Sequence, residues 1–240
     1  MEPDAYVELA RTEDRHWWFV ARREILSSQI ERLGLPGSAR ILEIGSGTGG
    51  NLRMLSRHGR VCGMEMDGTA RELAVSKTGA EFDIRPGACP NEVPYVGDTF
   101  DLVCLFDVLE HIEEDSATLE VVRGLLADRG HVLVSVPAYQ WMWSAHDEFL
   151  HHKRRYTAPE LAEKLRGASL SVDRITYFNT LLFPFAVAAR FASRGRSPGT
   201  GIPSDAINSA LRQVFSSERR LLQSFDLPFG LSLLAIASAA

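Results

Sequence analysis

The chain has 240 residues, of which 45% are hydrophobic and 24% charged, and its formal net charge is −5. This composition is typical of a globular protein, and the acidic balance argues against a nucleic-acid-binding surface. No apolar run reaches the ~18 residues that a membrane-spanning helix needs, and the polar segment 1–15 does not resemble a secretion signal. The three cysteines form no CxxC pair, so we expect reduced thiols in a cytoplasmic protein.

Helical and strand patterns alternate along the first part of the chain. The predicted helices are 13–30, 49–59, 68–79, the second part of 99–112, and 116–130. The predicted strands are 39–45, 60–66, 81–87, the first part of 99–112, and 131–139. Such alternation predicts a parallel sheet with right-handed crossovers and helices on both faces.

The last third of the chain begins with a helix over 157–169. Thr157 is its expected N-cap, Pro159 lies in the first turn and Glu160 has the capping-box spacing. Strands are then predicted over 170–178 and 230–238, and we expect them to pair. An insertion separates them, with an apolar run over 179–195, a Gly/Pro/Ser linker and a helix over 205–225.

A glycine-rich turn, ILEIGSGTGG, follows the first predicted strand. Gly45, Gly47 and Gly50 satisfy the dinucleotide pattern GxGxxG, and Gly49 in place of Gly50 gives GxGxG equally well. Glu65 ends the second strand, about 20 residues after the first glycine, where a carboxylate can accept both hydroxyls of a ribose. The pattern predicts a nucleoside-containing cofactor at the carboxyl end of the sheet.

Glu43, inside the first strand, narrows the class of cofactor. A carboxylate beside the turn repels a pyrophosphate and suits an ammonium or sulfonium ligand better. Together, the segments ILEIGSGTGG, GMEMD, FDLVCLFDVLEHI and GHVLVSVP resemble the successive motifs of the class I S-adenosylmethionine-dependent methyltransferases.

This resemblance implies a fold. It is a doubly wound, Rossmann-like α/β sheet of seven strands in the order 3-2-1-4-5-7-6, with strand 7 antiparallel. The paired strands 170–178 and 230–238 match that arrangement. We expect one methyltransferase domain over 1–240, composed of an N-terminal helical lid (1–37), a Rossmann-like core (38–180), a helical insertion (181–228) and a last strand (229–240).

The resemblance also implies a cofactor site for S-adenosyl-L-methionine. Glu65 would hold the ribose and Met66 would lie on the adenine. Ala88 stands where many relatives have an acid that meets the adenine amino group, so we expect it to contact adenine through its backbone only. The residues expected along the methionine part of the cofactor are Gly45, Ser46, Gly47 and Gly49.

Four further residues are expected at the cofactor, two of them at its methyl group. Phe106 and Asp107 end the fourth strand and would face the methyl group, although Asp107 fits a helix cap equally well. In the predicted helix 13–30, Trp18 could cover the sulfonium, and the alternative is that Trp17 and Trp18 only pack the helix onto the core. By resemblance, Arg22 of this lid would meet the cofactor carboxylate.

The segment WSAHDEFLHHKRRYT, residues 143–157, leaves the carboxyl end of the fifth strand and should lie over the cleft. His152 in this segment and His111 after the fourth strand are the expected bases, with Asp107 as a third catalytic group. The basic run 153–155 is either an anion clamp or a solvated face.

A finer resemblance concerns possible metal binding. DVLEHI with HKRRYTAPEL is similar to a pattern of ubiquinone-pathway O-methyltransferases and small-RNA 2′-O-methyltransferases, some of which hold a divalent metal there. The matching residues are Asp107, Glu110, His111 and His152, a set suited to Mn²⁺ or Zn²⁺ rather than Mg²⁺. Many broader relatives keep the Glu-His pair without metal, and we expect no metal here.

Methyl transfer to O or N of a small-molecule or lipid-carrier-linked acceptor is therefore the predicted function. The alternatives are a NAD-dependent oxidoreductase, which the GxGxxG spacing permits, and a non-catalytic S-adenosylmethionine-binding subunit. The apolar run with Arg190, Arg194 and Arg196 predicts a lid over the acceptor cleft, or else a helix in weak contact with a membrane surface. The oligomeric state is left open.

Overall fold

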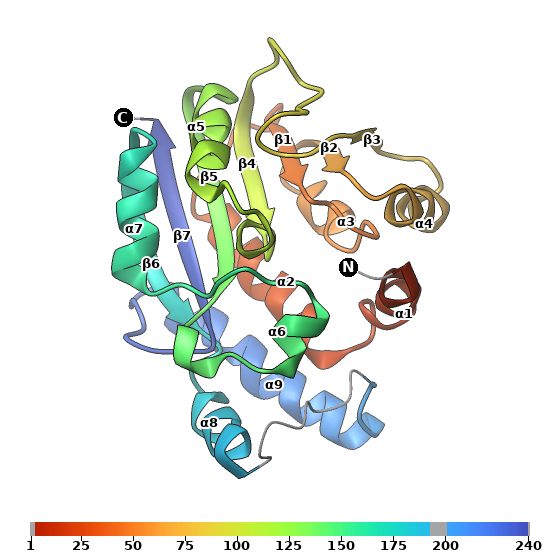
Figure 1. Ribbon diagram of the computed structural model, residues 1–240, viewed down its shortest axis with the longest axis vertical. Helices are drawn as coiled ribbons and strands as arrows, with labels where there is room; N and C mark the ends of the chain where they lie inside the picture. Colours follow the sequence, from red (N-terminus) through yellow and green to blue (C-terminus); the bar gives the residue numbers. More distant parts are fainter. Residues whose placement is uncertain (1–2, 193–200, 240) are drawn as a thin grey trace.

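The computed structural model describes residues 3–192 and 201–239. Its centre is a seven-stranded sheet in the order β3-β2-β1-β4-β5-β7-β6, in which only β7 runs antiparallel to its neighbours (Figure 1). This confirms the predicted order and the predicted direction of the last strand. The strands are β1 (Arg40–Ile44), β2 (Arg60–Glu65), β3 (Asp83–Pro86), β4 (Phe100–Phe106), β5 (Leu126–Pro137), β6 (Leu170–Phe178) and β7 (Ser232–Ala239).

Helices cover both faces of the sheet because the inner strands carry apolar side chains on both sides. One buried cluster joins the sheet to α5 (Asp115–Gly124) and α7 (Ala158–Gly167). The other joins it to α2 (Trp17–Glu31), α3 (Leu52–Leu55) and α9 (Asp205–Leu221). Successive residues of β4, such as Val103 and Cys104, belong to opposite clusters, as the alternation of a strand requires.

The predicted helices of the first half differ from the structure at three places. The helix expected over 49–59 is reduced to the four residues of α3, and Gly59 does not end a helix but lies against the carbonyl of Ala39. The helix expected after β4 is only the 3₁₀ turn η1 (Leu109–His111), because Asp107 turns the chain with φ +56°. The helix expected over 116–130 ends at Gly124, and β5 begins at Leu126 by pairing with Phe100.

The N-terminal segment forms α1 (Pro3–Thr12) and α2, and α4 (Gly68–Thr78) contacts α1. The two tryptophans that begin α2 meet different partners, since Trp17 packs edge-on against Phe215 of α9 and Trp18 lies over Arg22. Their divergence follows from the ~100° rotation between neighbouring residues of a helix.

The insertion between β6 and β7 contains α8 (Phe183–Ala192) and α9, as predicted. Arg194 and Arg196 lie outside the described residues. Within residues 3–192 and 201–239, the helices all fall short of the length and apolar character that crossing a bilayer demands. The segment after β5 contains the 3₁₀ turn η2 (Gln140–Met142) and α6 (Ala145–Phe149), and both lie beyond the carboxyl ends of β4 and β5 (Figure 1).

Candidate active site

The glycine-rich turn connects β1 to α3 with three left-handed residues, since Gly45, Gly47 and Gly49 have φ of +68°, +52° and +79°. A side chain at Gly45 would place its Cβ 2.5 Å from Val108, so this glycine lets the turn approach the segment after β4. A Cβ at Gly47 would meet nothing within 4 Å, so the backbone at Gly47 borders open space. Ser46 is buried, and its hydroxyl has no hydrogen-bond partner among the described residues.

Gly50 has a separate structural reason to be glycine. Its Cβ would lie 2.0 Å from the Oε2 atom of Glu13, a buried residue between α1 and α2. Glu13 accepts a hydrogen bond from the Thr48 hydroxyl at 2.5 Å and pairs with Lys77 of α4 at 2.7 Å. The third glycine of GxGxxG is therefore needed to make room for the Glu13 side chain. It gives no independent support to the prediction that the turn binds a dinucleotide. The sequence offered no signal that would have singled out Glu13.

Glu65 lies at the end of β2 and is 5% exposed. Its carboxylate accepts hydrogen bonds from the backbone N–H of Gly47 and of Asp67, each at 2.9 Å. The predicted ribose-binding group is thus fixed against the glycine turn. Met66, next in the chain, is 72% exposed, so its side chain is accessible to a ligand. Ala88 bonds to Glu92 through both its N–H and its carbonyl, so a contact with adenine would have to share these groups.

Glu43 is buried in β1, and one of its carboxylate oxygens accepts a hydrogen bond from the Asn51 amide at 2.7 Å. The other oxygen has no hydrogen-bond partner among the described residues. Burial raises the pKa of Glu43 to about 8, against the lowering effects of Asn51 and Arg22. A buried carboxyl of this kind accommodates a cation much better than a pyrophosphate.

Arg22 of α2 reaches the carboxyl end of β4. Its guanidinium lies 3.0 Å from the Asp107 carboxylate, 4.9 Å from the centre of the Trp18 ring and 5.7 Å from that of Phe106. The structure therefore gathers these four predicted residues into one cluster. Asp107 pairs with Arg22 rather than with the histidines, and burial raises its pKa despite the nearby positive charge. The expected contact between Arg22 and the cofactor carboxylate stays a prediction.

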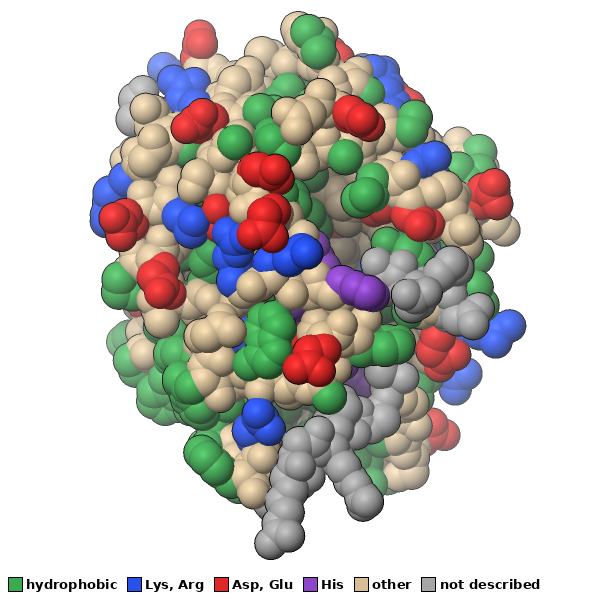
Figure 2. All heavy atoms as spheres, viewed as in Figure 1, with side chains coloured by type: hydrophobic (Ala, Val, Ile, Leu, Met, Phe, Trp, Pro, Cys, Tyr) green, Lys and Arg blue, Asp and Glu red, His purple; other side chains and the backbone are tan. Residues whose placement is uncertain are grey.

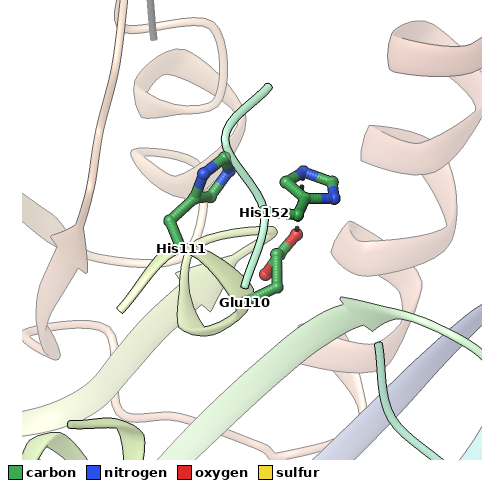
Figure 3. A group of neighbouring side chains, drawn as sticks. All are labelled: Glu110, His111 and His152. Carbon is green, nitrogen blue, oxygen red and sulfur yellow. Dashed lines mark ion pairs between the residues drawn. The ribbon is translucent and has the colours of Figure 1, made fainter. Parts of the chain in front are cut away.

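Glu110, His111 and His152 form a second cluster beside the first. They come from η1 and from the loop after α6, and one ligand atom of each lies within 4.8 Å of the others (Figure 3). The two imidazole rings are 4.6 Å apart and perpendicular, and the Nε2 atom of His152 is 4.0 Å from Glu110 Oε1. Burial, and then His152, lower the pKa of His111 to about 3, so this ring is neutral near pH 7.

Glu110 is fully buried, and neither carboxylate oxygen has a hydrogen-bond partner among the described residues. Burial, followed by the charge of Asp107, raises the pKa of Glu110 well above its usual range. An orphaned carboxylate next to two imidazoles fits a divalent cation such as Zn²⁺ or Mn²⁺. Three of the four residues of the metal pattern therefore suit a metal, whereas Asp107 is turned toward Arg22.

The basic residues after His152 do not form a free anion clamp. Arg155 donates from Nε and Nη2 to the two carboxylate oxygens of Asp147, at 2.7 and 2.9 Å. Arg154 pairs with Asp115 at 2.8 Å, and Lys153 is 3.9 Å from Glu113. Figure 2 shows the resulting mixture of acidic and basic side chains beside histidine at a hollow in the surface. Each of these cations therefore has an acidic partner in the folded chain, and Arg155 in particular is held by Asp147.

Asp147 is, with Glu13, a residue that the sequence interpretation missed. Burial alone would raise its pKa, but hydrogen bonds from His152 and Arg155 outweigh that effect and hold the pKa well below its usual range. The available signal was the S-x-x-D spacing of Ser144 and Asp147, which forms a capping box at α6.

The sheet order, the glycine turn with Glu65 at the end of β2, and the buried Glu43 together define a class I S-adenosylmethionine-dependent methyltransferase. The chain belongs to the methyltransferase-domain family, whose profile matches residues 18–180. S-Adenosylmethionine is accordingly its cofactor.

Known proteins similar to this chain carry the same activity in their names. A ubiquinone biosynthesis O-methyltransferase of Xanthomonas axonopodis pv. citri (strain 306) is 25% identical over 190 residues, covering 72% of this chain and 77% of that protein. Among solved structures, a complex between the Haloferax volcanii Trm112 methyltransferase activator and a protein described as a methyltransferase matches with a TM-score of 0.66, 20% identity, and coverage of 98% and 95%. A Galdieria sulphuraria protein described as a sarcosine dimethylglycine methyltransferase matches with a TM-score of 0.63, 13% identity, and coverage of 92% and 86%. At these identities, the two structures establish likeness of fold.

Proposed function

We propose that this methyltransferase transfers the methyl group to a hydroxyl or amine of a small-molecule or carrier-linked acceptor bound beside Glu110, His111 and His152. The observation that carries the proposal is the meeting of these three side chains at the carboxyl end of β4, next to Phe106 and Asp107. Similarity to a protein named as an O-methyltransferase favours a hydroxyl acceptor.

The reaction is an in-line displacement. The acceptor oxygen or nitrogen forms a bond to the methyl carbon while the carbon–sulfur bond breaks, and the sulfur leaves with the electron pair as a thioether. The donor is already activated, so the protein mainly has to orient the acceptor and exclude water. The acceptor proton passes to an imidazole, and His152 is the better base because burial opposes protonation of His111.

Glu110, His111 and His152 would also be the ligands of a divalent cation, which would lower the pKa of an acceptor hydroxyl. In that case the two imidazoles bind through neutral nitrogens, and the buried Glu110 carboxylate supplies the negative charge. The proposal of methyl transfer does not depend on the metal, since His152 can accept the proton directly.

His152→Ala tests the proposed role of the cluster. We expect turnover to fall about 10²–10⁴-fold, the usual contribution of a general base, with little change in the affinity for S-adenosylhomocysteine. His131→Ala is the matched control, because His131 lies on β5 and pairs with Asp173 of β6 at 3.5 Å. A loss of cofactor affinity in His152→Ala would instead place the loop on the cofactor side.

We further propose that α8 is a lid on the acceptor side. Arg190 of α8 donates a hydrogen bond to the carbonyl of Trp143 in the loop that carries His152, which supports this role. Phe185 and Phe191 are 73% and 75% exposed, and they are available to an apolar acceptor or to a membrane interface.

If α8 is a lid, the protein should not co-sediment with anionic liposomes at any ionic strength. Co-sedimentation at low salt that fades as salt is added, and that Phe185→Ser with Phe191→Ser abolishes, would instead support a membrane-surface helix. The control for this pair is Phe225→Ser, because Phe225 follows α9 and is 64% exposed.

A further inference from the structure

The loop that carries His152 is built around the buried carboxylate of Asp147. This residue lies in α6 and is fully enclosed. Its Oδ2 atom accepts hydrogen bonds from the backbone N–H and the hydroxyl of Ser144, at 2.9 and 3.0 Å. Arg155 donates to both oxygens, and the Nδ1 atom of His152 lies 2.9 Å from Oδ1. Asp147 therefore holds the histidine and its own loop together.

These contacts determine which nitrogen of His152 carries the hydrogen. An arginine can only donate hydrogen bonds. A carboxylate that pairs with a guanidinium through two hydrogen bonds is ionised, so it can only accept them. The hydrogen between Asp147 and His152 therefore belongs to Nδ1. A neutral imidazole has one N–H, so Nε2 keeps a lone pair.

The Nε2 atom, which carries no hydrogen, lies on the side of Glu110 and His111. Nε2 is 4.0 Å from Glu110 Oε1, and the His152 ring meets His111 edge to face (Figure 3). The backbone of the loop is fixed as well, because the N–H of His152 donates to the Asp147 carbonyl and that of Lys153 to the Glu110 carbonyl. The ring therefore cannot turn its other nitrogen toward the cleft without breaking the contact with Asp147.

We propose that Asp147, itself held by Arg155, is a positioning residue that fixes His152 in the Nδ1–H tautomer and directs its lone pair at the acceptor. This inference rests on the proposed function for its chemical purpose, but the tautomer is a property of the free protein. An ordinary histidine without such a partner has no fixed tautomer, since the hydrogen bond of one ring nitrogen decides the state of the other.

Nuclear magnetic resonance of protein containing ¹⁵N-histidine measures the tautomer. The spectrum is recorded at pH 8 in EDTA, so that no bound cation imposes the tautomer, and the His152 signals are identified by their loss in His152→Gln. We expect Nδ1–H in the wild type, and Asp147→Asn should abolish this preference. Ser144→Ala should keep it, since that variant removes a hydroxyl that does not touch His152. A wild-type spectrum with the hydrogen on Nε2 would overturn the proposal, even if Asp147→Asn failed to fold.

Kinetics provide the second measurement. Asp147→Asn should lower turnover about 10–100-fold, as loss of a histidine-orienting partner does elsewhere. Combined with His152→Ala, it should add no further loss, because Asp147 acts through His152. Additive losses would mean that Asp147 only supports the loop, and the positioning role would be wrong. If His152→Ala alone left turnover unchanged, the proposed function would fail while the spectrum still decided the tautomer.

Discussion

Replacing Glu65 should weaken cofactor binding. The carboxylate accepts two backbone hydrogen bonds, from Gly47 and Asp67, and it is predicted to accept the ribose hydroxyls as well. A hydrogen bond to a charged group contributes about 1.5–3 kcal/mol, and two bonds that share one carboxylate contribute less than their sum. Loss of the ribose pair in Glu65→Ala should cost on the order of 2–3 kcal/mol, which corresponds to about 30–160-fold in the dissociation constant.

The same change should also reduce the stability of the protein without ligand, because the N–H groups of Gly47 and Asp67 lose their acceptor. Glu65→Gln separates the two effects, since it keeps one acceptor oxygen and nearly the same shape. We expect an affinity between those of wild type and Glu65→Ala. Titration calorimetry with S-adenosylhomocysteine gives the affinities, and thermal unfolding gives the stability. Wild-type affinity in a folded Glu65→Ala variant would refute the assignment of the ribose to Glu65.

Three further predictions concern residues around the cofactor and acceptor. With a pKa of about 8, Glu43 is mostly protonated at pH 7, so binding of the cationic cofactor should release close to one proton. Calorimetry in phosphate and in Tris detects the release, because the two buffers take up protons with different enthalpies, and Glu43→Gln should abolish the difference. Equal binding enthalpies of the wild type in both buffers would contradict this prediction. Gly47→Ala and Gly34→Ala should each lose about 1–2 kcal/mol of stability, because both glycines have positive φ and a Cβ at either position would meet open space. Only Gly47→Ala should also weaken the binding of S-adenosylhomocysteine. Equal affinities of the two variants would mean that Gly47 is not part of the cofactor site. Because the pKa of His111 is lowered in the folded protein, its contribution to stability is present above pH 6.5 and is lost as the pH falls toward 3. Denaturant titrations at a series of pH values should therefore show that the free energy of unfolding falls less steeply with acid in His111→Gln than in the wild type. An unchanged dependence on pH would argue that His111 is freely protonated.

Local patterns predicted the outer strands and the caps well. Strand β6 covers Leu170–Phe178, the predicted range, and α7 has the capping box expected from Thr157 and Glu160. These elements depend on neighbours in the sequence, which short-range patterns describe. The order of the strands came from the resemblance to methyltransferases, since it depends on crossovers that no local pattern specifies.

The errors have a common physical origin in tertiary contacts. Residues 126–130 have helical spacing, but pairing between β4 and β5 draws them into a strand. The local sequence around Asp107 gave no sign of its partner, Arg22 of α2, which pairs with it from a distant part of the chain. The basic run 153–155 was expected to be either an anion clamp or a solvated face, whereas closure of the loop places Arg155 on Asp147. In each case, a partner that is distant in the sequence but close in the folded chain decided the outcome.

The measurement that most directly tests the account follows a labelled methyl group. The protein is incubated with S-adenosylmethionine carrying a deuterated methyl group and a panel of phenols, catechols and amines, and mass spectrometry identifies the labelled product and the labelled atom. The account predicts transfer to a hydroxyl or amine by the wild type and by His131→Ala, and a loss of at least about 100-fold in His152→Ala with S-adenosylhomocysteine affinity retained. Undiminished transfer by His152→Ala, or label on carbon of the product, would contradict it.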